Sequence, residues 1–474
     1  MAPFRNVARW MMVMATTPVR SLNLVVPLAG AFHPQTTAMR TTDTAGTVQD
    51  RSGAVSPLIG TSLRQGDIDS TTSTPGPRTS TTATRTTTTS TTSSAPVPSA
   101  DYPEHHHADF SFLELVEAYL DCRQGKRNSA SAMAFEQDLE RNLFHLHDEL
   151  QDGYYRPGRS ICFVITRPKA REVWAAEFRD RIVHHLLHNQ IAPRFYARFI
   201  VDSCACIPGR GTLYAARRLE TKIRSITQNW SRPAHYLKLD LANFFVSIDK
   251  GILRAQLAKH ISEPWWLRLA ETILFHDPRQ DFEYRGDLAM LDLVPPHKRL
   301  TNQTADRGLP IGNLSSQFFA NVYLDVLDQH VKHQIGARHY IRYVDDFILL
   351  HESPQWLNAA HADIKAFLPA RLNARLNPTK TILQPVDRGV DFVGQVIKPW
   401  HRYTRHRTVT AALQRVITVP DENLFETANS YFGLLRQAGD SHHDRARLAN
   451  VLRKRGHTIS GGITKTYRKS GATR

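Results

Sequence analysis

The sequence is poor in cysteine and lacks any long apolar run. Four of its 474 residues are cysteine, and no Cys-x-x-Cys pair occurs. Cys204 and Cys206 have no second pair of Cys or His residues at zinc-site spacing, which argues against a structural zinc. Few cysteines in a long chain are typical of a reducing cytosol, so we expect a cytoplasmic protein. No apolar run reaches the roughly 18 residues that span a membrane, so we expect no membrane partner.

Acidic residues are scarce relative to basic ones. The chain has 60 Lys and Arg against 44 Asp and Glu, which gives a formal net charge of +16. Such an excess indicates a polyanionic partner, most often nucleic acid, and a merely basic protein is the alternative that charge leaves open. A hydrophobic content of 41% in a chain of this length is enough for a sizeable core and two or three structural units.

The first 108 residues lack the composition of a folded domain. Among the 25 residues at 70–94, 19 are Ser or Thr, a composition that cannot bury a core and predicts disorder. Residues 1–42 contain four arginines and no acidic residue, which resembles a transit peptide, and a mis-chosen start codon is an equally good interpretation. We interpret residues 1–108 as a disordered Thr/Ser-rich extension, whose histidines at 105–107 form a solvated run rather than a metal site.

From residue 110 onward, apolar residues recur at helical and strand spacings. Gly153, Pro193 and Gly336 are the predicted ends of three helices. Interspersed helices and strands favour an α/β or α+β layered sheet over a helical bundle. The predicted helices are 110–124, 132–153, 178–193, 314–336, 356–374 and the basic tail from about 405, and the predicted strands are 160–168, 235–245 (running into a helix), 339–350 (a hairpin) and 389–399 (one strand or a pair).

Two adjacent carboxylates, Asp345 and Asp346, interrupt an apolar stretch at 343–349. The flanking residues are β-branched and aromatic, which predicts a hairpin with the pair at its tip. An acidic turn without a function is one interpretation, because Asp is a common turn residue. A third carboxylate, Asp240, ends an apolar strand 105 residues before Asp345, on the same side of the alternation as Lys238.

Neighbouring strands would bring Asp240 and Asp345 within reach of shared Mg²⁺ ions. Two divalent metals about 4 Å apart can activate an attacking oxygen and stabilise the leaving one in phosphoryl transfer. Mg²⁺ takes one or two carboxylates together with substrate phosphates. Adjacent like charges in an apolar hairpin are costly unless cations neutralise them. The pattern therefore predicts a two-metal site for phosphoryl transfer.

The motifs around these carboxylates resemble those of the reverse transcriptase family. Tyr-Val-Asp-Asp at 343–346 is similar to the family's Y-x-D-D hairpin, and 239–245 is similar to its first catalytic motif. The resemblance covers the chain from about 110 to its end, with five motifs in the expected order. It implies an RNA-directed DNA polymerase, a nucleotidyltransferase that adds dNTPs to the 3′-OH of a DNA or RNA primer on a template RNA.

The resemblance also implies a right-hand polymerase fold of the α/β (α+β) class. We expect an N-terminal helical region at 109–160, fingers and palm at 161–400, and a basic helical thumb at 401–474. The palm is expected to be an antiparallel sheet with helices behind it.

The resemblance further assigns the metal site and the catalytic residues. It implies that Asp240, Asp345 and Asp346, together with Leu241, form the site for two Mg²⁺ ions, for which Mn²⁺ can substitute. Asp345 is then the ligand shared with Asp240, and Asp346 is an outer or helper carboxylate. Lys380, beyond the hairpin, matches the lysine that would donate a proton to the departing pyrophosphate.

Further residues are assigned to the incoming dNTP. Residues 169–183 are similar to the family's fingers motif, in which Lys169 and Arg171 would hold the triphosphate. The fork of Arg and the point charge of Lys suit phosphate oxygens, and a solvated basic segment is the alternative. Phe245 matches the aromatic that blocks a 2′-hydroxyl and so selects dNTPs. A core position is its alternative, although Phe244 fits the core better.

Residues 307–325 resemble the template-gripping helix and its glycine turn. Gly312 would let the backbone approach the nascent base pair, and Ser316 and Gln317 would hydrogen-bond bases or sugars. A capped core helix is the alternative.

The remaining assignments concern nucleic acid. Arg210 and Gly211, in the motif at 204–219, and Tyr343 are the predicted nucleic-acid contacts, with an ordinary Gly-Arg-Gly loop as the alternative for the first two. Residues 391–399 are similar to the primer-grip hairpin.

The segment at 311–317 fits the pattern [I/L/V]-G-x-x-x-S-Q, which resembles the reverse transcriptases of diversity-generating retroelements. Ile311, Gln317 and Val344 depart from the patterns usual in group II intron enzymes. The resemblance then implies an enzyme that misincorporates at template adenines and works with a small basic helical accessory protein. An antiphage-defence or domesticated reverse transcriptase and a catalytically silent RNA-binding protein remain as alternatives.

Overall fold

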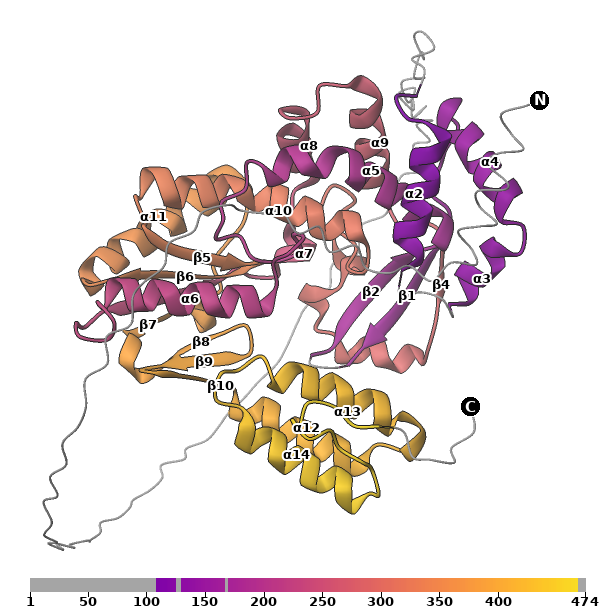
Figure 1. The fold of residues 1–474 in the computed structure, drawn as a ribbon. Helices are drawn as coiled ribbons and strands as arrows, with labels where there is room; N and C mark the ends of the chain where they lie inside the picture. The colour runs from indigo at the N-terminus through magenta and orange to yellow at the C-terminus, as the bar shows by residue number, and fades with distance from the viewer. Residues whose placement is uncertain (1–107, 125–128, 167–168, 468–474) are drawn as a thin grey trace, which may run out of the picture. The chain divides into compact units, whose positions relative to one another are not determined.

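The computed structural model, shown in Figure 1, describes residues 108–124, 129–166 and 169–467. The chain divides into two units, 1–96 and 97–474, and all described residues belong to the second. The predicted extension, apart from residue 108, and its histidines at 105–107 therefore lie outside the described residues. Within the part of the chain that the structure describes, every helix is too short or too polar to cross a membrane.

Three sheets organise the second unit. Their strands are β1 (Ser160–Ile165), β2 (Arg171–Ala176), β3 (His235–Asp240), β4 (Phe282–Tyr284), β5 (His339–Tyr343), β6 (Asp346–His351), β7 (Ile382–Pro385), β8 (Val390–Phe392), β9 (Gln395–Lys398) and β10 (His401–Thr404). The central sheet has the order β5-β6-β3-β7 and is antiparallel throughout. A second sheet has the order β2-β1-β4, and a third has the order β10-β9-β8. The predicted hairpin at 339–350 and the strand pair at 389–399 are confirmed.

Helices surround these sheets. The α-helices are α2 (Phe112–Arg123), α3 (Ala130–Glu136), α4 (Leu139–Gln151), α5 (Phe178–Tyr196), α6 (Thr212–Ile226), α7 (Phe244–Ser247), α8 (Lys250–Ala258), α9 (Pro264–Phe275), α10 (Leu314–Gln329), α11 (Pro354–Leu372), α12 (His406–Thr418), α13 (Asp421–Leu435) and α14 (His442–Lys454). Shorter 3₁₀ or π segments are η1 (Leu288–Leu293), η2 (Pro296–Lys298), η3 (Leu300–Asn302), η4 (His330–Gln334), η5 (Pro378–Lys380) and η6 (Val386–Arg388). The mixed α/β class with an antiparallel sheet agrees with the prediction.

The central sheet is buried on both faces. On one face, Tyr236 of β3 packs with Ile348 of β6 and with Leu219 and Ile223 of α6. Successive side chains of a strand point to opposite faces, so Leu237 lies on the other face, where α11 contacts β3 and β6 (Figure 1). A strand buried on both faces carries a continuous apolar run, and a carboxylate at its end is therefore conspicuous.

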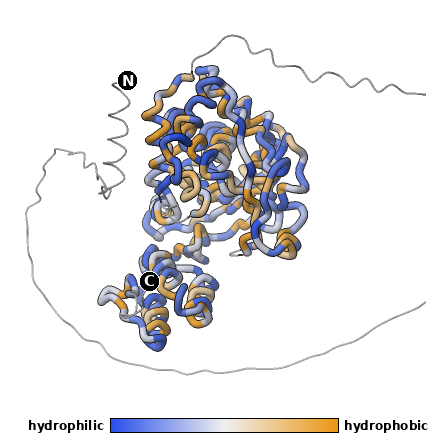
Figure 2. Tube along the Cα trace, turned by 90° about the vertical axis from the view of Figure 1, so that its right-hand side faces the viewer, coloured by the Kyte–Doolittle hydropathy of each residue, from blue (hydrophilic) through white to orange (hydrophobic). Residues whose placement is uncertain are grey.

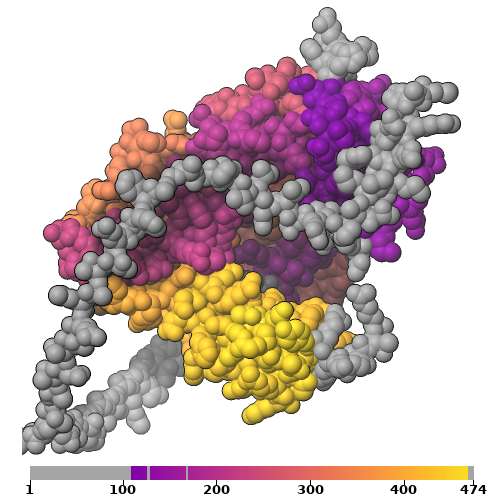
Figure 3. Space-filling model, in the orientation of Figure 1, coloured from indigo at the N-terminus to yellow at the C-terminus, as the bar shows by residue number. Residues whose placement is uncertain are grey.

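The C-terminal helices α12, α13 and α14 have a core of their own, which includes Phe432. Apolar and polar positions alternate along these helices in Figure 2, as expected for helices with one buried face. Thr212 Oγ1 donates a hydrogen bond to Gln437 Oε1 at 3.0 Å, and the amide of Asp440 donates to the carbonyl of Arg402 at 2.9 Å. These contacts join the C-terminal helices, yellow in Figure 3, to α6 and to the third sheet.

One predicted helix, 132–153, is interrupted in the structure. It divides into α3 and α4 because Asp138 leaves the helical region, with φ −135° and ψ 57°. The side chain of Asn142 donates to the carbonyl of Phe135 at 2.9 Å and so satisfies an acceptor at the interruption. The predicted stop at Gly153 has the expected positive φ of 74°.

One other predicted boundary differs from the structure. The helix predicted to end at Pro193 continues to Tyr196, because a proline near a helix end removes a single N–H and the last turn still forms. The third sheet includes His401, which pairs with Lys398, and the tail predicted to be helical from about 405 begins its first helix at His406.

Candidate active site

The register of the central sheet brings three carboxylates to one end of it. Asp240, the last residue of β3, lies opposite Asp346, the first residue of β6. Tyr343 of β5 also pairs with Asp346, so the β5–β6 turn consists of Val344 and Asp345 alone. The amide of the residue after Asp240, Leu241, donates to the carbonyl of Asp345 at 3.2 Å. The residues predicted to form the metal site therefore lie beside one another.

The turn itself is strained. Val344 has a φ of 55°, in the left-handed region that β-branched residues rarely adopt. Two-residue hairpins often need a positive φ in the turn, and Gly or Asn normally supplies it. Strained backbone of this kind persists where the surrounding structure holds it, and it is concentrated at functional sites.

Two lysines supply positive charge to the carboxylates. Lys380 Nζ donates to both oxygens of Asp240, at 2.6 and 2.7 Å, and Asn377 Nδ2 donates to Asp240 Oδ1 at 3.3 Å. Lys238 Nζ lies 3.1 Å from Asp346 Oδ2, whereas the other oxygen of Asp346 is buried and has no hydrogen-bond partner. The site therefore holds more negative charge than its side chains satisfy.

Burial perturbs these groups. It raises the pKa of Asp346 to about 6, although Lys238 acts in the opposite direction. Burial, followed by the charge of Asp240, raises the pKa of Asp345. The charge of Lys380, followed by burial, lowers the pKa of Lys169, which also senses Asp240. Lys169 therefore belongs to the same electrostatic environment as the carboxylates.

The donor set suits a hard divalent cation. Among the residues that the structure describes, no three His, Cys, Asp or Glu side chains are grouped closely enough to hold a metal ion as they stand. The chemistry nevertheless fits Mg²⁺, because carboxylate oxygens are its preferred protein ligands. The unpartnered oxygen of Asp346 and the lysine bound to Asp240 indicate where cationic charge is needed.

Comparison with known proteins finds one family that is similar to the region around these carboxylates. Residues 167–397, just under half of the chain, match the reverse transcriptase (RNA-dependent DNA polymerase) family. No curated protein matches the sequence of the chain.

Similar solved structures include two yeast telomerases. One is telomerase from Candida albicans in complex with a TWJ fragment of telomeric RNA, at 13% identity and a TM-score of 0.37, covering 63% of this chain and 54% of that one. The other is apo telomerase from Candida tropicalis truncated from its C-terminal domain, at 13% identity and a TM-score of 0.39, covering 54% of this chain and 58% of that one. The chain thus spans little more than half the length of these two structures.

The adjacent aromatic residues Phe244 and Phe245 differ in burial. Phe244 is 3% exposed and contacts Tyr323, with ring centroids 6.4 Å apart, so its predicted core position is confirmed. Phe245 is half-buried and meets the edge of the Phe244 ring. Its position leaves part of the ring available to a ligand.

Gly312 is required by a close approach of two backbones. Its φ is 134°, and a Cβ would lie 2.9 Å from Val173 Cγ1 and 3.0 Å from the Trp174 carbonyl oxygen. The amide of Trp174 donates to the carbonyl of Ile311 at 2.7 Å, which fastens this turn to β2. The next residue, Asn313, accepts from the amide of Ala176 at 3.0 Å. Asn313 was not predicted, and its place directly after Gly312 is the signal that could have found it.

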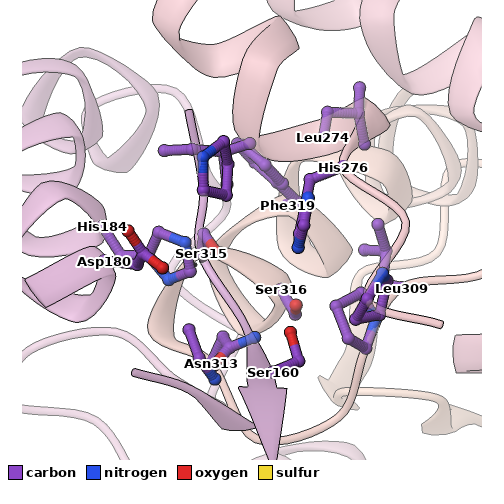
Figure 4. Close-up of a pocket in the computed structure, with 15 residues that line it drawn as sticks. Ser160, Asp180, His184, Leu274, His276, Leu309, Asn313, Ser315, Ser316 and Phe319 are labelled. Carbon is purple, nitrogen blue, oxygen red and sulfur yellow. Dashed lines mark hydrogen bonds between the residues drawn. The ribbon is translucent and has the colours of Figure 1, made fainter. Parts of the chain in front are cut away.

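Ser316 and Gln317, which were predicted to act together, differ in exposure. Gln317 is exposed, whereas Ser316 is 3% exposed and faces a cavity between α10, α5 and α9 (Figure 4). The helical phase of α10 turns Ser316 inward, so it offers no surface to bases or sugars in this conformation. Polar side chains that line the cavity include Ser160, Asp180, His184, His276, Asn313 and Ser315.

The predicted nucleic-acid contacts have structural roles in the free chain. Arg210 Nη1 donates to the carbonyls of Ile200 and Ser203, at 2.9 and 2.8 Å, so this arginine fixes its own loop. Gly211 has an extended backbone that any residue adopts. Tyr343 is half-buried against the core of the central sheet. Arg171 is the exposed first residue of β2, so its side chain is accessible to a ligand.

Proposed function

We propose that this chain is an RNA-directed DNA polymerase that adds dNTPs to the 3′-OH of a DNA or RNA primer on a template RNA. One observation carries the proposal. The register places Asp240 opposite Asp346, with Asp345 in the adjoining turn, within the region that matches the reverse transcriptase family. Three carboxylates at one sheet end, one of which has a buried oxygen without a hydrogen-bond partner, suit metal-assisted phosphoryl transfer.

The residues at the sheet end have distinct proposed roles. Asp240 and Asp345, with Leu241 beside them, would hold Mg²⁺, which activates the primer hydroxyl and stabilises the leaving phosphate when bound, and Mn²⁺ can replace it. Asp346 is an outer carboxylate, neutralised in part by Lys238. Lys380, which contacts Asp240 in the free chain, would donate a proton to the departing pyrophosphate.

Other residues bind the nucleotide and the nucleic acid. Lys169 and Arg171 hold the triphosphate, consistent with the influence of the Asp240 and Lys380 charges on Lys169. Gln317 faces outward from α10 and is available to the template. A net charge of +16 supplies the attraction for the polyanionic primer and template.

We further propose that the enzyme belongs to a diversity-generating retroelement in the cytoplasm. The sequence at 311–317 and Val344 support this assignment. The substrate is then the retroelement's template RNA, copied with errors at adenines, and a small basic helical protein is the expected partner.

Primer extension tests the activity. Purified chain is supplied with an RNA template, a DNA primer, Mg²⁺ and dNTPs, and the variant Asp345→Asn is compared with Asp387→Asn, which changes an exposed carboxylate outside the site. Template-dependent product from wild type and Asp387→Asn, but not from Asp345→Asn, supports the proposal. A wild-type chain that binds RNA and makes no product, even with proteins encoded beside it, favours a silent RNA-binding protein.

Sequencing the product tests the subclass. Errors concentrated opposite template adenines support the diversity-generating assignment. Accurate or untemplated product favours an antiphage-defence or domesticated reverse transcriptase.

Phe245→Ala tests sugar selection. Truncating the half-buried ring should admit ribonucleotides, with a rise of about tenfold in rNTP incorporation relative to dNTP incorporation, because one lost steric contact is worth about 1–3 kcal/mol. Competition assays with mixed rNTP and dNTP measure the ratio. An unchanged ratio would contradict the assignment of Phe245 to sugar selection.

A further inference from the structure

Arg342, on β5 directly before the turn-flanking Tyr343, is a fully buried arginine whose donors are all used. Its side chain and that of Asp328 have no exposed surface. Arginine has five N–H donors, and five hydrogen bonds are formed here. They run from Nε to Asp328 Oδ1 (2.8 Å), from Nη2 to Asp328 Oδ2 (2.6 Å) and Ser203 Oγ (2.9 Å), and from Nη1 to Asn321 Oδ1 (3.2 Å) and the Val344 carbonyl (3.1 Å).

The bond to Val344 connects this buried network to the strained turn. Val344 has a φ of 55°, and its carbonyl is the acceptor that Arg342 holds. Asp328 belongs to α10, as does Asn321, and a bidentate pair fixes the guanidinium in both position and orientation. The turn is therefore held through side chains of α10.

Backbone contacts hold Arg342 in place as well. Its amide donates to the carbonyl of Asp202 at 3.0 Å, and its own carbonyl accepts from the amide of Cys204 at 2.9 Å. Tyr340 adds a hydrogen bond of 2.8 Å to Asp328 Oδ1. With so many anchors, the guanidinium cannot follow the turn if the turn relaxes.

We propose that Arg342 is a positioning residue, which holds the Val344–Asp345 turn in the conformation that directs Asp345 toward Asp240. This inference rests on the proposed function. A purely structural role would make Arg342 a core ion pair whose loss affects stability alone. The Val344 contact predicts instead that its loss affects the geometry of the carboxylates.

Arg342→Lys is the first test. Lysine keeps the charge beside Asp328 but lacks the fork that reaches Asp328 and the turn together. We expect kcat for primer extension to fall about 10–100-fold, as for residues that orient metal ligands, while the dNTP KM and the primer–template Kd stay within twofold. Mn²⁺ binding without nucleotide, followed through the electron paramagnetic resonance of free Mn²⁺, should weaken similarly.

Ser203→Ala is the matched control. It removes another hydrogen bond of the same guanidinium and leaves the bond to Val344 intact. We expect a lower Tm with unchanged kcat and unchanged Mn²⁺ affinity. Equal effects of Arg342→Lys and Ser203→Ala on Mn²⁺ affinity would overturn the proposal.

Val344→Gly gives the decisive comparison. Glycine adopts a positive φ without strain, so the turn then needs less support from Arg342. The double variant R342K/V344G should lose less kcat and less Mn²⁺ affinity than R342K alone, relative to their respective backgrounds. If the effects of R342K and V344G on kcat and on Mn²⁺ affinity simply add in the double variant, Arg342 does not act through the turn.

Two further outcomes are distinguishable. Should Arg342→Lys fail to fold, the pair D328N/R342Q replaces the ion pair by neutral amides of similar size, and the same readouts apply. Should wild type make no product, the proposed function fails, whereas the Mn²⁺ titrations still report whether Arg342 controls the carboxylates.

Discussion

Two groups of acidic side chains lie on either side of the Val344–Asp345 turn, and they differ in how many of their oxygens are hydrogen-bonded. The first is Asp328 with its partners, and the second consists of Asp240, Asp345 and Asp346. Behind the turn, both oxygens of Asp328 accept from Arg342, and Tyr340 adds a third bond. At the turn, Asp346 has one buried oxygen without a hydrogen-bond partner, and Asp240 accepts from Asn377 and from Lys380, whose side chain is 45% exposed. The first group is fully paired within the chain, whereas the second has two lysines for three carboxylates.

The difference separates framework from function. A buried charge whose donors and acceptors are all paired forms a rigid support, because removing either partner leaves an uncompensated charge. A buried carboxylate with an unpartnered oxygen and a raised pKa is instead typical of a site that receives a ligand. The bond from Arg342 to the Val344 carbonyl connects the two groups, so the paired group around Asp328 supports the turn that carries Asp345.

The largest expected effect comes from Asp345→Asn. Asparagine preserves the shape of the side chain and removes the charge that attracts Mg²⁺, so kcat should fall by at least about 10²–10³-fold. Because burial and the charge of Asp240 raise the pKa of Asp345, the neutral replacement should not lower Tm. Extension kinetics and thermal unfolding check both statements. A variant that extends primers at the wild-type rate would contradict the ligand assignment.

Asp328→Ala should have the largest effect on stability. It leaves the Arg342 guanidinium buried without its counter-charge, which costs about 3–5 kcal/mol in the free energy of unfolding. Chemical denaturation measures the loss. Asp387→Ala, which truncates an exposed carboxylate, should stay within about 0.5 kcal/mol of wild type. Similar losses in the two variants would mean that the buried pair contributes no more to the free energy of unfolding than an exposed carboxylate does.

Asp346→Asn should act on stability in the opposite direction. The pKa of Asp346 is raised from 3.8 to about 6 in the folded chain, so folding favours its protonated form. Its contribution to stability is therefore complete below pH 3.8 and is lost as the pH rises through about 6. At pH 7 the asparagine variant should be more stable by roughly 1–3 kcal/mol. Unfolding measured from pH 4 to pH 7 should show the difference between variant and wild type growing with pH, and a constant difference would contradict the assignment.

The sequence predicted those features that depend on local pattern. The hairpin at 339–350 and the strand ending at Asp240 followed from residue type and alternation, and their pairing brought the carboxylates together as expected. Features that depend on helix phase or on distant partners were not predicted. Ser316 points into a cavity because neighbouring helices decide which side of α10 is buried.

Arg342 illustrates the same limit. Its partners Asp328 and Ser203 lie 14 and 139 residues away, so no local spacing indicates them. A single arginine within an apolar strand was the available signal, because a buried charge must be paired. Sequence alone could have predicted that Arg342 has a partner, and could not have predicted that it also holds the turn.

The smallest expected effect comes from Lys380→Met, which tests whether a lysine occupies the place of a cation. Lys380 Nζ contacts both oxygens of Asp240, so its removal frees this carboxylate for metal. A partly exposed ion pair is worth about 0.2–1 kcal/mol, so Mn²⁺ affinity without nucleotide should rise by at most about fivefold. Primer extension should slow, because the proposed proton donor is lost. Lys365→Met, which removes an exposed lysine of α11, should change neither quantity. Weaker Mn²⁺ binding in Lys380→Met would show that the lysine holds Asp240 in place for the metal ion instead of competing with the metal ion for this carboxylate. Lys380 would then have a supporting role like that of Arg342.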